Sequence, residues 1–352
     1  MSGGATDLGE ERPGLGSFGR LGDGREIREA VLVSEDGLEA RIIGWGAVLR
    51  DLRVPAPGGA RSVVLGYDRL DPYLDQPGYL GAVVGRYANR VADARFALDG
   101  REVRLLANEG RHALHGGPVG FARRPWSFVS RDATGAHLAL VSEDGDQGYP
   151  GRLVAFASYE VRAPLTLRIT LQAFADRPTP VNLTTHSYYN LDGSPDVREH
   201  LLTVAADRYT PVDSELIPTG ELLPVEGAPF DFRKPRALGE GAPRPGFDIN
   251  LVLAGPVGEA ELAWAATLAS PRSGLAMELW TSEPGLQVYD GHQLDQLSAP
   301  GRGGVHYRPF AGVALEPQRF PDGPNHPQFP PAIIRPGTVS RQVTELRFRL
   351  RD

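Results

Sequence analysis

Apolar and polar residues alternate along several short segments of this chain, and that period of two is the strongest constraint on its fold. Segments 167–175, 275–279 and 346–351 each carry an apolar side chain at every second position. This spacing is typical of strands that bury one face. The 352 residues include 43 glycines and 31 prolines, which favours many short strands joined by tight turns. The sequence therefore predicts an all-β protein.

The turn signals place these strands in one antiparallel domain. Asp99-Gly100 separates two apolar-flanked halves of segment 95–106, which predicts a β-hairpin. Only short stretches such as 68–76 are candidates for a helical turn. We see no linker, repeat or low-complexity segment between 17 and 352. We therefore expect a flexible N-terminal tail over 1–16 and a single large β domain over 17–352.

Composition and charge argue against several classes of function. The formal net charge is −7, from 37 basic and 44 acidic residues, and without a basic block we expect no nucleic-acid binding. The chain has no cysteine, which excludes disulfides, thiolate zinc sites and cysteine nucleophiles. The polar start resembles neither a signal peptide nor an anchor, and no apolar run approaches ~18 residues. We therefore expect no membrane contact and a cytoplasmic location.

The sequence gives no sound indication of a bound cofactor or metal. The segment GLGSFG (14–19) matches the glycine spacing of dinucleotide-binding loops, but no strand precedes it and no helix follows it. We expect a flexible loop there. The eight histidines form no metal-binding pattern.

One carboxylate stands at the end of an apolar run. Ala311–Leu315 is small and apolar, and Glu316 follows it directly. Pro317 comes next, and we expect it to end the strand, because proline lacks the N–H that a ladder needs. Glu316 is either a solvated strand end or a group aimed into a pocket.

Segment 180–191, PVNLTTHSYYNL, places many polar side chains among apolar ones, His186 among them. Burying such a strand is costly unless its polar groups pair with each other or with a ligand. Both interpretations stay open at this point.

Other polar residues are ambiguous when taken singly. Arg90 could be a carboxylate clamp or a surface residue, Asp248 a ligand or a turn residue, and Gln287 needs partners within an apolar strand. His115 precedes Gly116-Gly117, which suggests a turn that brings backbone close to a neighbour. Together with Glu316 as a base and His186 as an acid, this inventory suits a polyhydroxylated ligand.

Seven segments of the chain resemble, in order, the motifs of the aldose 1-epimerase (galactose mutarotase) family. They are GRYANRV (85–91), NEGRHALHGGPVGFARRPW (108–126), PVNLTTHSYYNL (180–191), DSELIPTGELLPVEGAPFDFR (213–233), GFDIN (246–250), PGLQVYDG (284–291) and LEPQRFPDGPNHPQFPPAIIRPG (315–337). The resemblance runs from about Phe18 to the C-terminus. It implies a large antiparallel β-sandwich, often called a supersandwich. It also implies interconversion of the α and β anomers of free aldoses such as galactose and glucose, with no metal and no organic cofactor.

The resemblance also implies a role for individual residues. The catalytic base falls on Glu316 and the catalytic acid on His186, and we expect a neighbour to raise the pKa of His186 so that it is protonated near neutral pH. His115 is an alternative acid. The implied sugar-binding residues are Arg90, Asn89, His115, Asp248 and Gln287.

This chain departs from the family pattern at two places. Many members have a histidine after the aspartate, where this chain has Ile249, and Thr-Gly-Asn after the tyrosine, where it has Asp290-Gly291-His292. We expect both changes to lie near the sugar and to bear on substrate preference.

Three other functions are compatible with the same scaffold. A hexose-6-phosphate 1-epimerase needs additional basic residues, which Arg123 and Arg124 could supply. A non-catalytic carbohydrate-binding protein would need neither Glu316 nor His186. A glycosidase would use Asp248 and Glu316 as its carboxylate pair. The partner in each case is a small carbohydrate, and monomer and homodimer both stay open.

Overall fold

The computed structural model describes residues 14–75, 77–255 and 261–350. Within these ranges the fold is built of antiparallel strands, with one short α-helix, α1 (Asp71–Leu74), inside the predicted helical turn. The all-β prediction is confirmed. None of the helices in the described ranges is long and apolar enough to cross a membrane.

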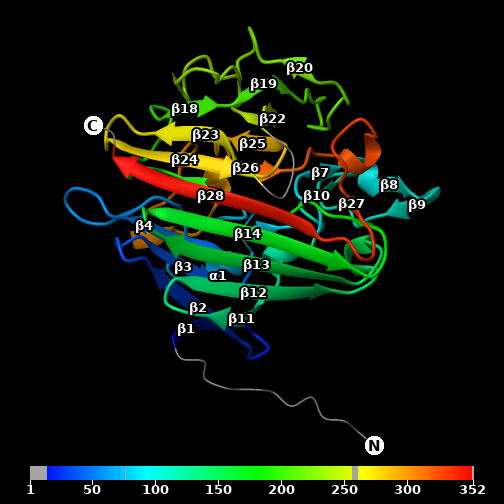
Figure 1. Ribbon diagram of the computed structural model, residues 1–352, viewed down its shortest axis with the longest axis horizontal. Coiled ribbons are helices and arrows are strands. Elements are labelled where there is room, and N and C mark those ends of the chain that lie inside the picture. Colours follow the sequence, from blue (N-terminus) through cyan, green and yellow to red (C-terminus); the bar gives the residue numbers. More distant parts are fainter. Residues whose placement is uncertain (1–13, 76, 256–260, 351–352) are drawn as a thin grey trace, which may run out of the picture.

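The largest sheet has nine strands and forms one face of the molecule (Figure 1). Its order is β11 (Ser127–Arg131), β12 (Gly135–Ser142), β13 (Leu153–Arg162), β14 (Thr166–Ala175), β28 (Ser340–Leu350), β24 (Leu275–Thr281), β23 (Ala263–Ala269), β18 (Leu201–Val204) and β21 (Arg236–Ala237). The C-terminal strand β28 lies between β14 and β24. The sheet is therefore complete only when the last segment of the chain is in place.

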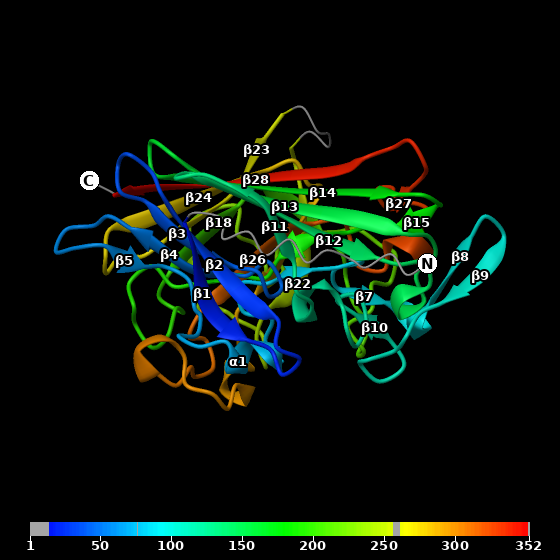
Figure 2. The ribbon, with the colours of Figure 1, turned by 90° about the horizontal axis from the view of Figure 1, so that it is seen from below.

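Two smaller sheets lie beneath this large one (Figure 2). The five-stranded sheet has the order β1 (Leu15–Arg20), β2 (Glu26–Val33), β3 (Glu39–Ile43), β4 (Leu49–Val54) and β5 (Arg61–Ser62). The six-stranded sheet has the order β17 (Tyr188–Tyr189), β26 (Val313–Gln318), β25 (Gly285–Tyr289), β22 (Asp248–Leu253), β19 (Ala206–Tyr209) and β20 (Leu223–Pro224). The result is a sandwich of one long sheet over two shorter ones.

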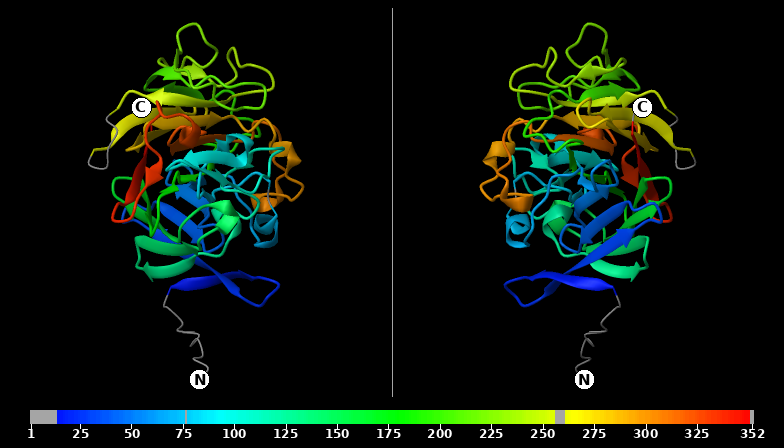
Figure 3. Two further views of the ribbon diagram at one scale, coloured as in Figure 1. Left: turned by 90° about the vertical axis from the view of Figure 1, so that its right-hand side faces the viewer. Right: turned by 90° about the vertical axis from the view of Figure 1, so that its left-hand side faces the viewer.

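Short two-stranded ladders and 3₁₀ turns complete the fold. The two-stranded ladders pair β7 (Arg90–Val91) with β10 (Ala113–Leu114), β6 (Val83–Val84) with β16 (Thr184–Thr185), β8 (Arg95–Leu98) with β9 (Arg101–Arg104), and β15 (Thr179–Pro180) with β27 (Ile333–Ile334). The 3₁₀ turns are η1 (Ala92–Ala94), η2 (Phe121–Arg123), η3 (Asp146–Gly148), η4 (Leu294–Gln296), η5 (Arg302–Gly304) and η6 (Gly323–Asn325). The orange segment that carries η4 and η5 lies far from the large sheet in Figure 3.

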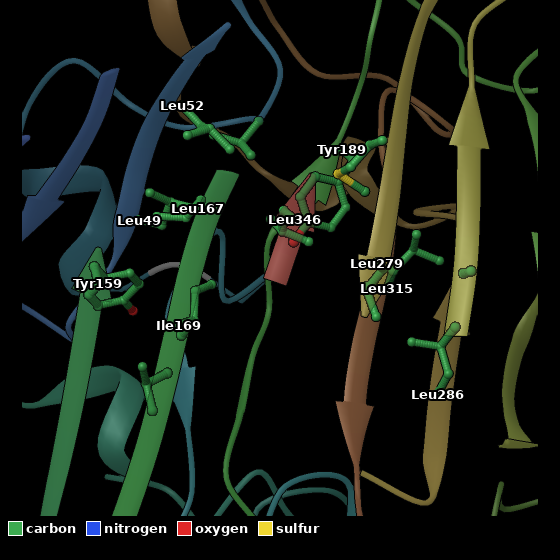
Figure 4. Packing of buried hydrophobic residues seen from close by; sticks show 14 of the residues in the cluster. Leu49, Leu52, Tyr159, Leu167, Ile169, Tyr189, Leu279, Leu286, Leu315 and Leu346 are labelled. Carbon is green, nitrogen blue, oxygen red and sulfur yellow. The ribbon is translucent and has the colours of Figure 1, made fainter. Parts of the chain in front are cut away.

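One apolar cluster joins the three main sheets. It takes side chains from every layer, and Figure 4 shows Leu49 and Leu52 of β4, Leu167 and Ile169 of β14, Leu346 of β28, and Leu315 of β26. The alternation expected in 167–175 is confirmed, since Leu167, Ile169, Leu171 and Ala173 all point into this cluster. Burial of this apolar surface is the main stabilising term for such a sandwich.

Local predictions agree with the structure at some points and differ at others. The hairpin is confirmed: β8 and β9 meet at Asp99 and Gly100, whose φ angles of 48° and 77° suit a primed two-residue turn. The predicted loop at 14–19 is wrong, because β1 starts at Leu15 and pairs with β2. β1 therefore overlaps the end of the predicted tail, and residues 1–13 lie outside the described ranges.

Glu283, in the turn between β24 and β25, makes stability depend on pH. It is buried, and burial raises its pKa to about 7 from 4.5, although Arg319 lies 3.9 Å away. A raised pKa means that the folded state binds the extra proton between pH 4.5 and 7, so Glu283 lowers stability as pH rises through that window. We expect Glu283→Gln to stabilise the protein at pH 8 by at most about 3 kcal/mol and to have little effect at pH 4.5.

Urea unfolding at the two pH values checks this expectation. The control is Glu345→Gln, because hydrogen bonds from Arg168 and Arg347 lower the pKa of Glu345 despite its burial. That substitution should destabilise the protein at pH 8. Equal effects of Glu283→Gln at both pH values would contradict the assignment.

Candidate active site

Three neighbouring strands of the six-stranded sheet carry polar side chains on one face. Glu316 of β26 is in register with Gln287 of β25, and Gln287 is in register with Asn250 of β22. Because side chains alternate along a strand, Asp248 lies on the same face as Asn250, diagonal to Gln287. The hydrogen bond from Gln287 Nε2 to Asp248 Oδ1, 2.6 Å long, follows from this register.

The opposite face of the same three strands belongs to the apolar cluster. It carries Leu315 of β26, Leu286 and Val288 of β25, and Ile249 and Leu251 of β22. The expectation that Ile249 lies near the sugar is therefore wrong, because Ile249 points into the core.

Pro317 does not end β26. Pairing with β25 continues through Pro317 to Gln318, whereas pairing with β17 involves only Val313 and Ala314. Pro317 thus lies beyond the ladder with β17, where the lack of an N–H is tolerated. Glu316 is an interior residue of its strand, and it is 2% exposed.

Segment 180–191 is not one strand. It is broken into the end of β15, β16 and β17, and His186 lies between β16 and β17. The backbone of His186 is fixed on both sides, since its N–H donates to Ala82 and its carbonyl accepts from Gly81. Asn182 and Asn190 take part in structural bonds to backbone carbonyls, which confirms the buried-network interpretation for these two.

The ladder of β7 and β10 brings the next group of residues to the site. Leu114 pairs with Arg90, and the N–H of His115 donates to the carbonyl of Asn89. Asn89 and His115 have φ angles of 63° and 49°, so both adopt the left-handed conformation. Gly116 then approaches the backbone of Gly85 so closely that a Cβ would lie 1.9 Å from its carbonyl oxygen. The predicted close approach is to the chain itself.

These segments enclose one pocket. The lining residues are Pro77, Gly78, Tyr79, Asn89, Arg90, Glu109, Leu114, His115, His186, Tyr188, Asp248, Tyr289, Gln293, Leu294, Gln296, Leu297 and Glu316. Six of the seven predicted site residues are among them. Gln287 is the exception: its amide holds Asp248 instead of facing the pocket. The sequence did not single out Glu109 or the three tyrosines of the lining, Tyr79, Tyr188 and Tyr289, because nothing in their local pattern separates them from ordinary turn or core residues.

Glu316 and His186 face each other in the pocket. Nε2 of His186 lies 3.7 Å from Oε1 of Glu316, beyond hydrogen-bond distance. Oε2 of Glu316 and Nδ1 of His186 are buried without a hydrogen-bond partner among the described residues. Glu316 and His186 both line the pocket and are not hydrogen-bonded to each other, which leaves their pocket-facing atoms available to a ligand.

Burial controls the protonation of this pair. It raises the pKa of Glu316 well above its ordinary value, and nearby Asp248 adds to that effect. It lowers the pKa of His186 to about 4. The expectation that a neighbour raises the pKa of His186 is therefore wrong for the ligand-free pocket. Loss of hydration on burial is the largest cause of this shift.

His115 has a fixed tautomer. The backbone N–H of Asn89 donates to its Nδ1 over 3.1 Å, so that nitrogen must be unprotonated. Burial also lowers the pKa of His115 well below its ordinary value. His115 is therefore a neutral imidazole whose Nε2–H is a hydrogen-bond donor, which is a poor starting point for a proton-donating acid.

Arg90 lies between two carboxylates. Its Nε and Nη2 bond to Glu109 at 2.5 and 2.8 Å, and its Nη1 lies 3.7 Å from Oδ2 of Asp248. Burial raises the pKa of Asp248, and Arg90 opposes that shift. Arg90 and Asp248 together present an array of donors and acceptors to a ligand.

The second departure from the family pattern lies behind the pocket wall. His292 Nδ1 lies 2.9 Å from Oδ1 of Asp290, and Oδ2 of Asp290 accepts from the backbone N–H of Phe247. Neither Asp290 nor His292 lines the pocket, although the ring of His292 lies against Tyr289, which does. This change touches the pocket lining through the ring of Tyr289, and His292 is among the groups that moderate the raised pKa of Asp248.

Arg123 and Arg124 do not supply charge to the pocket. Arg124 forms an ion pair with Asp146 and donates to the carbonyl of Val141. Arg123 packs its guanidinium over the ring of Tyr79, 5.7 Å from its centroid. Neither residue is among those that line the pocket.

Comparisons with known proteins agree on one family. The family model described as aldose 1-epimerase matches residues 29–347. The chain is 41% identical over 337 residues to the galactose mutarotase of Rattus norvegicus, covering 94% of this chain and 97% of that one. It is 38% identical over 337 residues to the aldose 1-epimerase of Escherichia coli strain K12, covering 93% and 96%.

Solved structures give the same result. The aldose epimerase homologue from C. elegans has a TM-score of 0.86 at 30% identity, covering 92% of this chain and all of that one. The galactose 1-epimerase from Lactobacillus acidophilus NCFM has a TM-score of 0.82 at 26% identity, covering 96% and 98%. The expected supersandwich fold is thereby confirmed, and the chain belongs to the aldose 1-epimerase family.

Proposed function

We propose that this protein is an aldose 1-epimerase that interconverts the α and β anomers of free aldoses such as galactose and glucose, with Glu316 and His186 as its acid–base pair. The observation that supports this most directly is that the two groups line one pocket and face each other over 3.7 Å without a hydrogen bond between them. A cytoplasmic location is part of the proposal, and the cysteine-free sequence is compatible with it.

The reaction needs one base and one acid at the same time. Glu316 takes the proton from the anomeric hydroxyl, and His186 gives a proton to the ring oxygen, so the ring opens to the aldehyde. Rotation about the C1–C2 bond presents the other carbonyl face, and the ring closes with the roles reversed. No group is consumed, because the pair holds one proton before and after the cycle.

The buried environment favours a pair with a single proton. Two charged groups would lose hydration in the pocket, so the free pocket favours a neutral imidazole and a protonated carboxyl. The sugar brings hydroxyl groups that hydrogen-bond to the ionic form. The proton then passes to His186, and Glu316 becomes the base. Distances in a ligand-free pocket are often longer than those in the reacting complex.

The remaining polar residues position the sugar. Asn89, Arg90 and Asp248 offer donors and acceptors for hydroxyl groups, and His115 offers its Nε2–H. Gln287 acts one step further out, because it fixes the carboxylate of Asp248. Holding C1 and the ring oxygen in line with the acid–base pair accounts for part of the rate.

The site favours free sugars over the alternatives. A hexose 6-phosphate would need the additional cations that Arg123 and Arg124 do not bring to the pocket. Comparing rates on glucose and glucose 6-phosphate tests that alternative. A glycosidase would release sugar from a glycoside, whereas we expect no release.

Removing the base should abolish most of the activity. We expect Glu316→Gln to lower kcat by roughly 10²–10⁴-fold, because each placed proton-transfer group contributes about that much. Polarimetry with freshly dissolved α-glucose or α-galactose measures it. The matched control is Glu283→Gln, another buried carboxyl outside the pocket, which should keep its activity. Near wild-type rates for Glu316→Gln would refute the base assignment.

The two histidines should behave differently. We expect His186→Asn to lose most of its kcat, since it removes the acid. His115→Gln keeps a neutral donor and should mainly raise KM, because His115 acts in binding. The same polarimetric assay over a range of sugar concentrations separates the two effects. An unchanged kcat for His186→Asn would move the acid role to His115.

The pH profile should follow the proton count of the pair. As pH falls toward about 4, His186 takes up a second proton while Glu316 is still protonated, so the pair has no base. At high pH the pair loses its last proton, at a point set by the raised pKa of Glu316, and then it has no acid. We therefore expect kcat/KM to hold down to about pH 5 and to fall below that value. An acid limb near the ordinary imidazole pKa of ~6.5 would contradict this account.

A further inference from the structure

Glu109 holds Arg90 in a way that the proposed chemistry does not require. Its two oxygens accept from Nε and Nη2 of Arg90 at 2.5 and 2.8 Å, so it engages one whole edge of the guanidinium. Such two-point pairing is the strongest geometry between arginine and a carboxylate. Arg90 is almost fully buried, whereas Glu109 lies at the pocket rim with its side chain 37% exposed. The carboxylate is therefore the solvent-facing partner of the pair.

A tight turn fixes Glu109 in that place. The backbone N–H of Glu109 donates to the carbonyl of His112, and the N–H of His112 donates back to Glu109. Gly110, in the turn, has a φ of 57°. Outside the pocket, the next arginine, Arg111, pairs with Glu215 at 2.6 Å. Glu109 is thus held by backbone bonds, and its contact with Arg90 is not a chance encounter of two flexible side chains.

The pocket lining carries more acidic than basic side chains. Arg90 is the one arginine or lysine among the lining residues that the structure describes, and Glu109, Asp248 and Glu316 line the same pocket. His115 and His186 are neutral there. Even with Glu316 protonated, the wall carries two carboxylates against one guanidinium. A negatively charged ligand would meet net repulsion and an arginine that is already paired.

We infer that Glu109 is a specificity-determining residue, which neutralises Arg90 and so restricts the pocket to uncharged sugars. The inference rests on the proposed function and deepens it by naming the substrate class. A free Arg90 would attract a sugar that carries a carboxylate or a phosphate. With Glu109 present, Arg90 is left with donors for neutral hydroxyl groups.

The test compares galactose with galacturonate, which carries a carboxylate at C6. Exchange between the two anomers at equilibrium, followed by NMR, gives kcat/KM for both sugars. We expect Glu109→Gln to lower the ratio of kcat/KM for galactose to that for galacturonate by roughly tenfold. Glu109→Asp keeps the charge and should keep the ratio within about threefold of wild type. In wild type, added salt should also lower the ratio, and in Glu109→Gln this salt effect should be weaker.

Glu215→Gln is the matched control, because it removes a carboxylate from a nearby arginine pair that does not line the pocket. Its ratio should equal that of wild type. An unchanged ratio in Glu109→Gln, or an equal loss of selectivity in Glu109→Asp, would overturn the inference. A wild-type protein without exchange activity on either galactose or glucose would refute the proposed function instead. In that case calorimetric binding of the same two sugars to the same variants still tests Glu109.

Discussion

Packing of one face of β22, β25 and β26 against the large sheet is the constraint on which the site depends. Leucine, isoleucine and valine side chains anchor these strands in the core. Because successive side chains alternate in direction, the same anchoring turns Asp248, Gln287 and Glu316 to the other face. A shift of one residue in any of these strands would turn its polar side chains into the core, so the apolar residues fix the register that places the polar residues in the pocket. The same strand packing therefore forms both the core and the site.

Burial then determines what the polar face can do. A carboxyl and an imidazole in water would both be charged near pH 6. In this pocket the cost of lost hydration moves the pKa of Glu316 upward and that of His186 downward. The pair therefore holds one proton over a wide range of pH, which suits a reaction that removes one proton and adds another. The same environment keeps His115 neutral and confines it to donating a hydrogen bond.

Arg90 connects the acid–base pair to the choice of substrate. It moderates the pKa of Asp248 and of Glu316, yet its own charge is offset by Glu109 at the rim. A pocket that needs a buried arginine for hydroxyl binding would otherwise also attract anions. The carboxylate of Glu109 resolves that conflict, and because it comes from a turn it can change without disturbing the core. The departures at Ile249 and His292, which the sequence places near the sugar, lie instead in the core and behind Tyr289.

The sequence by itself determined the fold class and most of the site. Alternation identified β14, β24 and β28, Asp99-Gly100 identified the hairpin, and the ordered motifs identified six residues that line the pocket. These features are local, or are fixed by residue type. Only the tertiary structure decided that Ile249 faces the core, that Gln287 supports Asp248, that Pro317 lies inside a strand, and that His186 is neutral. Each of these depends on which strand lies beside the residue and on how far the surrounding chain excludes water from it. Both are determined by contacts between segments far apart in the chain, so no local sequence pattern can predict them.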